Sequence, residues 1–158
     1  MKKARLILSA SMIALMGLSA VTFSSCSKDD DCAVGYTGKN CDVEIRTPML
    51  GTYNATDKND ADPTDVQTYT LSITTGATTP VVNIHSFGNF FSNTEIVTSN
   101  VTESGDNISF TIPSQLPDGS YTVSGSGTYN SKSKTITINY SISSGTQILN
   151  YTGTWTKQ

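Results

Sequence analysis

The sequence is poor in the residues that most enzymes use for catalysis. It has one histidine, His85, and three glutamates among 158 residues. An α/β-hydrolase would need a Gly-x-Ser-x-Gly turn between a strand and a helix, and the sequence contains none. The glutamates Glu44, Glu95 and Glu103 show no pairing of the kind that glycoside hydrolases use. These shortages favour a protein that is not an enzyme, with an unrecognised hydrolase as the least favoured alternative.

Basic residues are scarce after the first 25 positions. Lys2, Lys3 and Arg5 supply three of the 10 basic residues, whereas all 13 acidic residues lie further along the chain. Residues 26–158 therefore carry seven basic and 13 acidic residues, a net charge of −6. We do not expect such a chain to bind nucleic acid or an anionic bilayer by charge attraction.

The first 25 residues have the form of a secretory signal, and we expect an N-terminal signal helix there. A basic start is followed by an apolar run over 6–23, and small residues precede Cys26. This junction resembles a bacterial lipobox, which implies cleavage before Cys26 and acylation of its thiol. A retained transmembrane helix is the alternative, but the flank at 29–31 is acidic rather than basic. We therefore expect the chain to be held at a membrane by a lipid anchor on Cys26.

The acidic residues 29–31 follow Cys26 almost directly. They resemble the signal that sends Bacteroidota-type lipoproteins to the outer face of the outer membrane. The simpler interpretation is a solvated spacer. We expect an outer-membrane protein that faces the cell exterior, and the sequence leaves the inner face open.

Two cysteines remain if Cys26 is acylated. Cys32 and Cys41 enclose eight residues and match C-x-x-G-Y-x-G-x-x-C, which resembles the last disulfide loop of an EGF-like module. We expect them to pair in an oxidising compartment, with Gly35 and Gly38 in positive-φ turns and Tyr36 as the packing side chain. Zinc binding is disfavoured because no histidine lies nearby.

From residue 46 onward the apolar pattern has a period of two. Such alternation predicts antiparallel strands with one buried and one hydrated face. The middle of the chain is expected to bury Val82, Ile84, Ile96 and Val101. The clearest alternating segments are 69–74, 108–112, 121–129, 135–142 and 151–155, and a first strand is expected over 49–56.

Turn residues separate these segments at nearly even spacing, which gives about eight strands. An up-and-down antiparallel barrel hides its edges by pairing the first strand with the last, and we favour this fold. Inward-facing Gly125, Gly127 and Gly153 permit the sharp curvature that a small barrel needs. A two-layer β-sandwich is the alternative. The expected organisation is a signal peptide over 1–25, a lipidated tether with one disulfide loop over 26–46 and a barrel over 47–158.

Four segments between residues 47 and 157 carry a resemblance to a known family. The segments 50–53, 112–115 and 123–129, followed by 136–140, are similar to the lipocalin-like (calycin-like) lipoproteins of Bacteroidota. The resemblance implies a barrel and an envelope location, and it brings no catalytic residue. A lipocalin Gly-x-Trp motif is missing, since Gly51-Thr52-Tyr53 stands in its place.

Two groups of residues are candidate binding sites. The first is an oxygen-rich loop over 56–66 that could hold Ca²⁺, although it lacks the glycine and terminal glutamate of an EF-hand and is more simply a solvated loop. The second is a phenylalanine cluster that could form a hydrophobic ligand rim or plug one end of the barrel. The oxygen ligands would be Asp57, Asn59, Asp60, Asp62 and Asp65, and the cluster is Phe87, Phe90 and Phe91.

Two functional hypotheses follow, and neither needs a cofactor. In the first, a surface-anchored barrel binds an unknown ligand or envelope protein, and Phe87, Phe90 or Phe91 lines an open mouth. In the second, the protein is a structural or accessory subunit of an outer-membrane complex without a ligand pocket. A barrel filled by residues such as Ile138 and Trp155 would favour the second.

Overall fold

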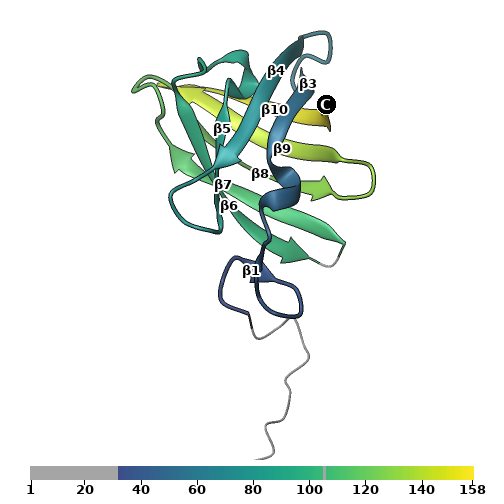
Figure 1. Cartoon of the computed structure of the whole chain (residues 1–158). Coiled ribbons are helices and arrows are strands. Elements are labelled where there is room, and N and C mark those ends of the chain that lie inside the picture. Colours follow the sequence, from purple (N-terminus) through teal and green to yellow (C-terminus); the bar gives the residue numbers. More distant parts are fainter. Residues whose placement is uncertain (1–31, 105) are drawn as a thin grey trace, which may run out of the picture.

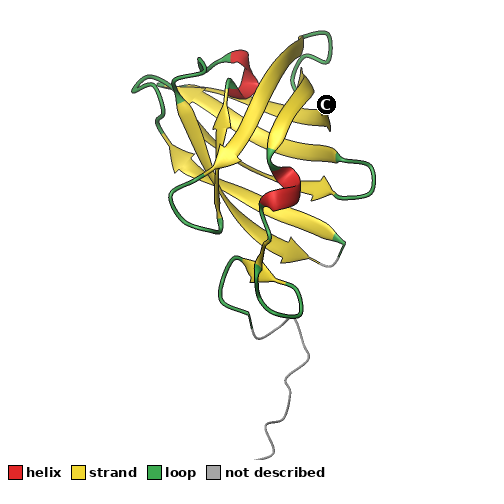
Figure 2. Ribbon diagram, in the orientation of Figure 1, coloured by secondary structure: helices red, strands yellow, loops and turns green. Residues whose placement is uncertain are grey.

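The computed structural model describes residues 32–104 and 106–158 (Figure 1). The signal segment, including its expected helix, Cys26 and the acidic residues 29–31 lie outside the described residues. Figure 2 shows that the described chain is almost entirely β-structure with two short 3₁₀ helices. None of the helices described is long and apolar enough to cross a membrane. The prediction of an all-β fold is confirmed.

Residues 32–50 form a small module ahead of the main sheet, which we call the disulfide module. Strand β1 (Tyr36–Thr37) pairs antiparallel with β2 (Val43–Glu44), and a bond between Cys32 and Cys41 closes the loop. The predicted disulfide is therefore confirmed. Gly35 and Gly38 have φ values of 92° and 89°, as expected for its turns. The 3₁₀ helix η2 (Thr47–Met49) leads from the module into the main sheet.

Eight antiparallel strands form a closed barrel, which confirms the favoured fold and shows that the sandwich alternative is wrong. Each strand pairs with its neighbours in sequence, and the last strand closes the barrel against the first, with Trp155 opposite Ala55. The strands are β3 (Gly51–Asn59), β4 (Val66–Thr75), β5 (Val81–His85), β6 (Ile96–Ser104), β7 (Asn107–Gln115), β8 (Thr122–Asn130), β9 (Thr135–Ser144) and β10 (Gln147–Lys157). The second 3₁₀ helix, η3 (Phe87–Asn89), lies between β5 and β6.

The barrel has two different ends. The proximal end bears the disulfide module, the turn 76–80, the hairpin between β6 and β7 and the turn 131–134, as Figure 1 shows. The distal end bears the connections 60–65, 86–95, 116–121 and 145–146. An even number of antiparallel strands places alternate connections at opposite ends, so these assignments follow from the topology.

The interior of the barrel is filled by the inward side chains of the predicted alternation. Trp155, Tyr53, Phe110 and Ile138 are all at most 2% exposed. Other inward positions are Leu71, Ile73, Val82, Ile84, Val101, Ile112, Val123, Ile136, Tyr140 and Ile142. A barrel filled by residues such as Ile138 and Trp155 favours the second of the two functional hypotheses drawn from the sequence, a subunit without a ligand pocket.

Two residues were assigned to the interior wrongly. Ile96 faces outward and is 39% exposed, because Val97, Ser99 and Val101 carry the inward phase of β6. Tyr121 is 38% exposed because β8 begins one residue later, at Thr122.

Inward glycines make room for neighbouring side chains. A Cβ atom at Gly127 would overlap the Phe110 ring, and one at Gly153 would overlap the Asp57 carboxyl group. The predicted inward position of these glycines is correct. These glycines permit the curvature of the strands, and they also leave space for bulky side chains from adjacent strands.

The outer face carries a belt of hydroxyl groups. One residue from each of seven consecutive strands lies in register with the next, and all are exposed or half-buried. Such cross-strand pairs stabilise a sheet while keeping its surface hydrated. The belt runs Thr68, Thr56, Thr154, Thr137, Thr128, Ser109 and Thr102.

We predict that Gly153→Ala destabilises the fold by about 3 kcal/mol, near the upper end for overpacking a core. The added methyl group would displace the Asp57 carboxyl group and press on Ile138. Urea unfolding measures the change, and Thr154→Val on the exposed face of the same strand is the control. Equal stability of the two variants would contradict this account of Gly153.

Candidate functional site

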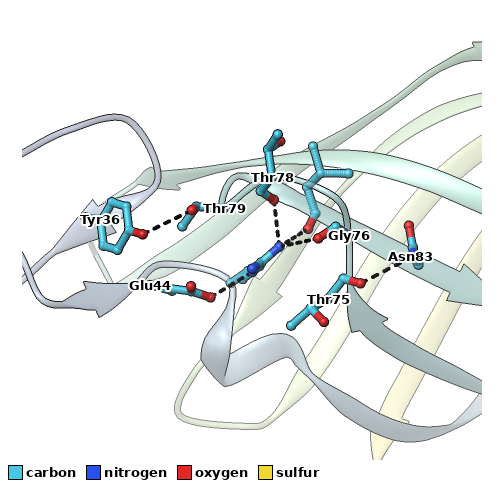
Figure 3. Close-up of polar contacts among 9 residues, drawn as sticks. Tyr36, Glu44, Thr75, Gly76, Thr78, Thr79 and Asn83 are labelled. Atoms are coloured by element: carbon cyan, nitrogen blue, oxygen red, sulfur yellow. Dashed lines mark hydrogen bonds and ion pairs between the residues drawn. The ribbon is translucent and has the colours of Figure 1, made fainter.

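A buried arginine joins the disulfide module to the barrel. Arg46 is 7% exposed, and its Nη1 lies 2.6 Å from the carbonyl oxygens of Thr78 and Val81 and 3.2 Å from that of Gly76. Its Nε donates to Glu44 Oε2 at 2.9 Å. Figure 3 shows Glu44 of the module facing the turn that contains Gly76 and Thr78. One guanidinium therefore satisfies carbonyls of a turn about 30 residues away and the carboxylate beside it.

Backbone packing reinforces the same junction. Gly35 lies against Pro80 and Thr79, so closely that a side chain at Gly35 would meet both residues. The Tyr36 hydroxyl accepts a hydrogen bond from Thr79 Oγ1 at 3.2 Å (Figure 3). Tyr36 was predicted to pack within the disulfide loop, and its hydroxyl contacts Thr79 of the barrel. The module is held in one orientation at the proximal end.

A carboxyl group lies inside the barrel, where the sequence predicted a loop. β3 continues to Asn59, so Asp57 faces inward and is fully buried. It accepts hydrogen bonds from Tyr69 at 2.5 Å, Tyr140 at 2.8 Å and Trp155 Nε1 at 2.9 Å. Sequence reasoning missed this hub, although positions 53, 55 and 57 share one phase of the strand. Its donors on β4, β9 and β10 tie three strands to β3.

Burial and the Asp57 charge together change the acidity of the two tyrosines. Desolvation is the largest cause that raises the pKa of Tyr69 and of Tyr140, and the negative charge of Asp57 adds to it. Burial likewise raises the pKa of Tyr53, whose hydroxyl donates to the Met49 carbonyl at 2.6 Å. These phenols remain protonated, so Tyr69 and Tyr140 donate to the Asp57 carboxylate and Tyr53 to the Met49 carbonyl.

The phenylalanine cluster forms a plug at the distal end. Phe87 is fully buried and contacts Tyr140 and Trp155 edge-on, with ring centroids 4.7 and 5.7 Å apart. Phe91 is 3% exposed. A rim made of all three phenylalanines is therefore wrong, because Phe87 and Phe91 turn into the core. Only Phe90 is half-buried, between Tyr151 and Tyr121.

The proposed calcium ligands are dispersed. Asp57 points inward, whereas Asp60 accepts from Thr152 on the outer face and Asp62 accepts from Thr64. Asp65 accepts from Asn59, Gln67 and Tyr151. Within 32–104 and 106–158, no three His, Cys, Asp or Glu residues are placed to hold a metal ion. The side-chain oxygens of Asp60, Asp62 and Asp65 therefore accept hydrogen bonds from neighbouring residues of the chain.

The single histidine has structural partners. His85 Nε2 lies 3.0 Å from Thr74 Oγ1, and Nδ1 lies 3.0 Å from the Asn93 carbonyl oxygen. This contact fixes the chain entering β6 against the end of β5. No carboxylate is among the hydrogen-bond partners found for His85.

Two hollows lie on the outside of the barrel. One, of about 250 Å³, is lined by residues of both the disulfide module and the proximal end of the barrel, Asn107 among them. The buried Asn107 Oδ1 has no hydrogen-bond partner among the described residues. The other, of about 230 Å³, lies on the outer side of β8, β9 and β10. Its lining is Asp60, Ser124, Gly125, Asn139, Tyr140, Ser141, Asn150 and Tyr151.

A group of exposed apolar residues encircles the distal end. These residues belong to five strands or connections and share no local sequence pattern, so no motif in the sequence points to them. We call this group the distal rim. It consists of Val66, Ile96, Leu116, Tyr121 and Ile148, each at least 38% exposed, together with half-buried Phe90.

Comparison with known proteins adds little to this geometry. No protein-family model and no curated protein matches the chain. Among solved structures it is similar to the crystal structure of a "putative outer membrane protein" from Bacteroides fragilis, with 17% identity and a TM-score of 0.44. The alignment covers 72% of this chain and 52% of that one, so the chain spans about half the length of its structural neighbour.

Arg46→Met should lower the free energy of unfolding by about 2–3 kcal/mol, because partly buried carbonyl groups lose a charged donor. We also expect faster proteolysis within residues 32–46, while the far-UV spectrum of the barrel is retained. Urea unfolding and limited proteolysis measure both effects. Lys132→Met is a matched control, since Lys132 makes an exposed ion pair with Asp106 at 2.6 Å. If both variants behave alike, Arg46 does not hold the junction.

Stability should fall as the pH rises above roughly 10, the pKa of tyrosine in an unfolded chain. The pKa values of Tyr53, Tyr69 and Tyr140 are raised in the folded state. Their contribution to stability is therefore complete below the unfolded pKa and is lost as the pH rises through the folded values. Phenolate absorbance, followed in native buffer and in denaturant, should show tyrosines that ionise only on unfolding. Free titration of all seven tyrosines in the folded chain would refute it.

Proposed function

We propose that the chain is a non-enzymatic lipoprotein, anchored through an acylated Cys26 to the outer membrane and facing the cell exterior. Within it, the barrel is an accessory unit that meets an envelope partner through its outside. The observation that carries this proposal is the filled interior: Asp57 has three donors, and Trp155 and Phe87 are fully buried. A barrel that stores a ligand needs an interior space that these side chains occupy.

Support for the anchor comes from the sequence and from the outer surface. Small residues precede Cys26, and an acidic stretch follows it. The belt of threonine and serine on the outside favours water over hydrocarbon. Attachment to the membrane is therefore assigned to the lipid, for which two or more acyl chains are sufficient. The resemblance of the sequence to calycin-like lipoproteins of Bacteroidota also supports an envelope location.

The disulfide module supports the accessory role. Arg46 and Gly35 fix it to the barrel, so the barrel is presented in a constant orientation relative to residue 32. A fixed orientation gives no advantage to a carrier that diffuses freely. It helps an anchored binding unit, because less orientational entropy is lost when the unit binds its partner.

Native mass spectrometry of the chain purified from cell membranes tests the proposal. We expect a polypeptide that begins at Cys26 and carries acyl chains, with no further bound molecule. Cys26→Ala should leave the signal attached and remove the acyl mass, and Cys32→Ala with Cys41→Ala should leave the acyl mass unchanged. An intact amino terminus in the parent chain would refute the anchor. A small molecule retained in one-to-one amount would refute the filled, accessory barrel.

A further inference from the structure

Exposed apolar side chains are concentrated at one end of the barrel. Seven large hydrophobic residues are exposed in the described chain, and five of them belong to the distal rim. Leu116 is 52% and Ile148 64% exposed. The other two, Val34 and Val43, belong to the disulfide module. Single exposed hydrophobic residues need no explanation, but a gathering at one end indicates an interaction surface.

Contacts connect several members of the rim. The Phe90 ring lies 6.5 Å from that of Tyr121 and 5.5 Å from that of Tyr151, measured between centroids. Gln115, directly before Leu116, accepts from the Thr98 N–H and donates to the Thr98 carbonyl, two residues after Ile96. Leu116, Ile96, Tyr121 and Phe90 thus border the same part of the distal end.

The distal end is also acidic. Its four connections contain Asp60, Asp62, Asp65, Glu95 and Asp118, and no lysine or arginine. Lys58, near the end of β3 and opposite Val66, is the one basic residue beside these connections, whereas Lys132, Lys134 and Lys157 lie at the opposite end. The distal end therefore carries five acidic residues against one basic residue. Hydrogen bonds from Thr64 lower the pKa of Asp62, and those from the Tyr121 and Ser120 N–H groups lower the pKa of Asp118. The Asp62 and Asp118 side chains are therefore charged at neutral pH.

We propose that the distal rim docks a cationic, apolar segment of a partner protein. This inference rests on the proposed function, in which the outside of the barrel meets the partner. Apolar side chains of the segment would cover Leu116, Tyr121 and Ile148, while its basic groups face the surrounding carboxylates.

The hollow on β8, β9 and β10 provides a place for a basic side chain. It lies beside the start of β10, where Ile148 is exposed, and its lining includes the Asp60 carboxylate and the Asn139 and Asn150 amides. Thr152 Oγ1 lies 2.9 Å from Asp60 Oδ1 and 3.0 Å from Asn139 Oδ1, so one hydroxyl hydrogen serves two acceptors. A lysine or arginine of the partner would satisfy the remaining acceptor.

The charge pattern also argues against an anionic ligand and against a bilayer of acidic lipids, which five carboxylates would repel. A second copy of the chain is the main competing occupant, because its proximal end presents Lys134 and Lys157, although the acidic residues Asp42, Glu103 and Asp106 lie at that end too. The disulfide module, which begins at residue 32, occupies that end (Figure 1). In a chain anchored through Cys26, this end would face the membrane, so two anchored copies could not stack end to end.

Binding of two labelled peptides tests the inference. The first alternates lysine with leucine and phenylalanine, and the second has glutamate in place of each lysine. The full chain, purified in a nonionic detergent, is titrated into each peptide and followed by fluorescence anisotropy. We expect the cationic peptide to bind and the acidic one not to bind. Leu116→Gln with Ile148→Thr should weaken binding by about tenfold, as removal of central apolar contacts does.

Variants that remove charges distinguish electrostatic attraction from nonspecific hydrophobic binding. Asp62→Asn with Asp118→Asn retains the turn-forming oxygens, and it should weaken binding several-fold and flatten its salt dependence. Val43→Thr and Asp106→Asn at the proximal end are matched controls that should leave affinity unchanged. Equal losses in rim and control variants would overturn the inference.

Two other outcomes would also overturn it. Binding of the acidic peptide with equal affinity would exclude charge recognition, and concentration-dependent dimers that disappear in the Leu116 and Ile148 variant would assign the rim to a second copy. The mass spectrum of the anchored chain does not depend on the rim. A chain that is acylated but fails to bind the peptide would therefore refute this inference and leave the anchor intact.

Discussion

The Asp57 carboxyl group is the constraint on which the interior of the barrel depends. A buried negative charge is costly unless donors surround it, and here Tyr69, Tyr140 and Trp155 point at its two oxygens. The donors come from three different strands, so the hub can form only when β3, β4, β9 and β10 lie in the observed register. A slip by one residue would turn every one of these groups to the opposite face. The net stabilisation from such a network is modest, and its larger effect is to exclude alternative closures of the barrel.

The aromatic residues around the hub fill the distal part of the barrel interior. Phe87 contacts both Tyr140 and Trp155 from the distal side, and Tyr140 stacks on Tyr151 with centroids 5.3 Å apart. Phe90 then continues the row to the surface. An opening at this end would have to separate Phe87 from the two donors beneath it. The segment between β5 and β6 therefore behaves as part of the core, and the residues that encircle it are the apolar side chains left exposed at this end.

Alternation of apolar and polar residues was sufficient to predict the strands and their closure, because one face of each strand is buried and the other is hydrated. It failed where both phases are apolar, as at Ile96 and Val97, and where the inward residue is charged, as at Asp57. The three donors lie 12, 83 and 98 residues from Asp57, so no local pattern could reveal them. Arg46 was equally hidden, since its acceptors are backbone carbonyls about 30 residues away. The distal rim is assembled from separate connections, and only the closed topology brings them together.

The two ends of the molecule differ in a way that a storage barrel would not require. At the proximal end a guanidinium is desolvated to hold a small module against a turn, at the cost of removing a charge from water. At the distal end apolar side chains remain exposed, although polar residues would make the same turns. Both features are costly in an isolated barrel, because desolvation of the guanidinium offsets part of what its hydrogen bonds contribute and the apolar side chains of the rim stay in water. They become favourable when the barrel is held by one end and contacts another macromolecule with the other, because a fixed orientation lowers the entropic cost of that contact.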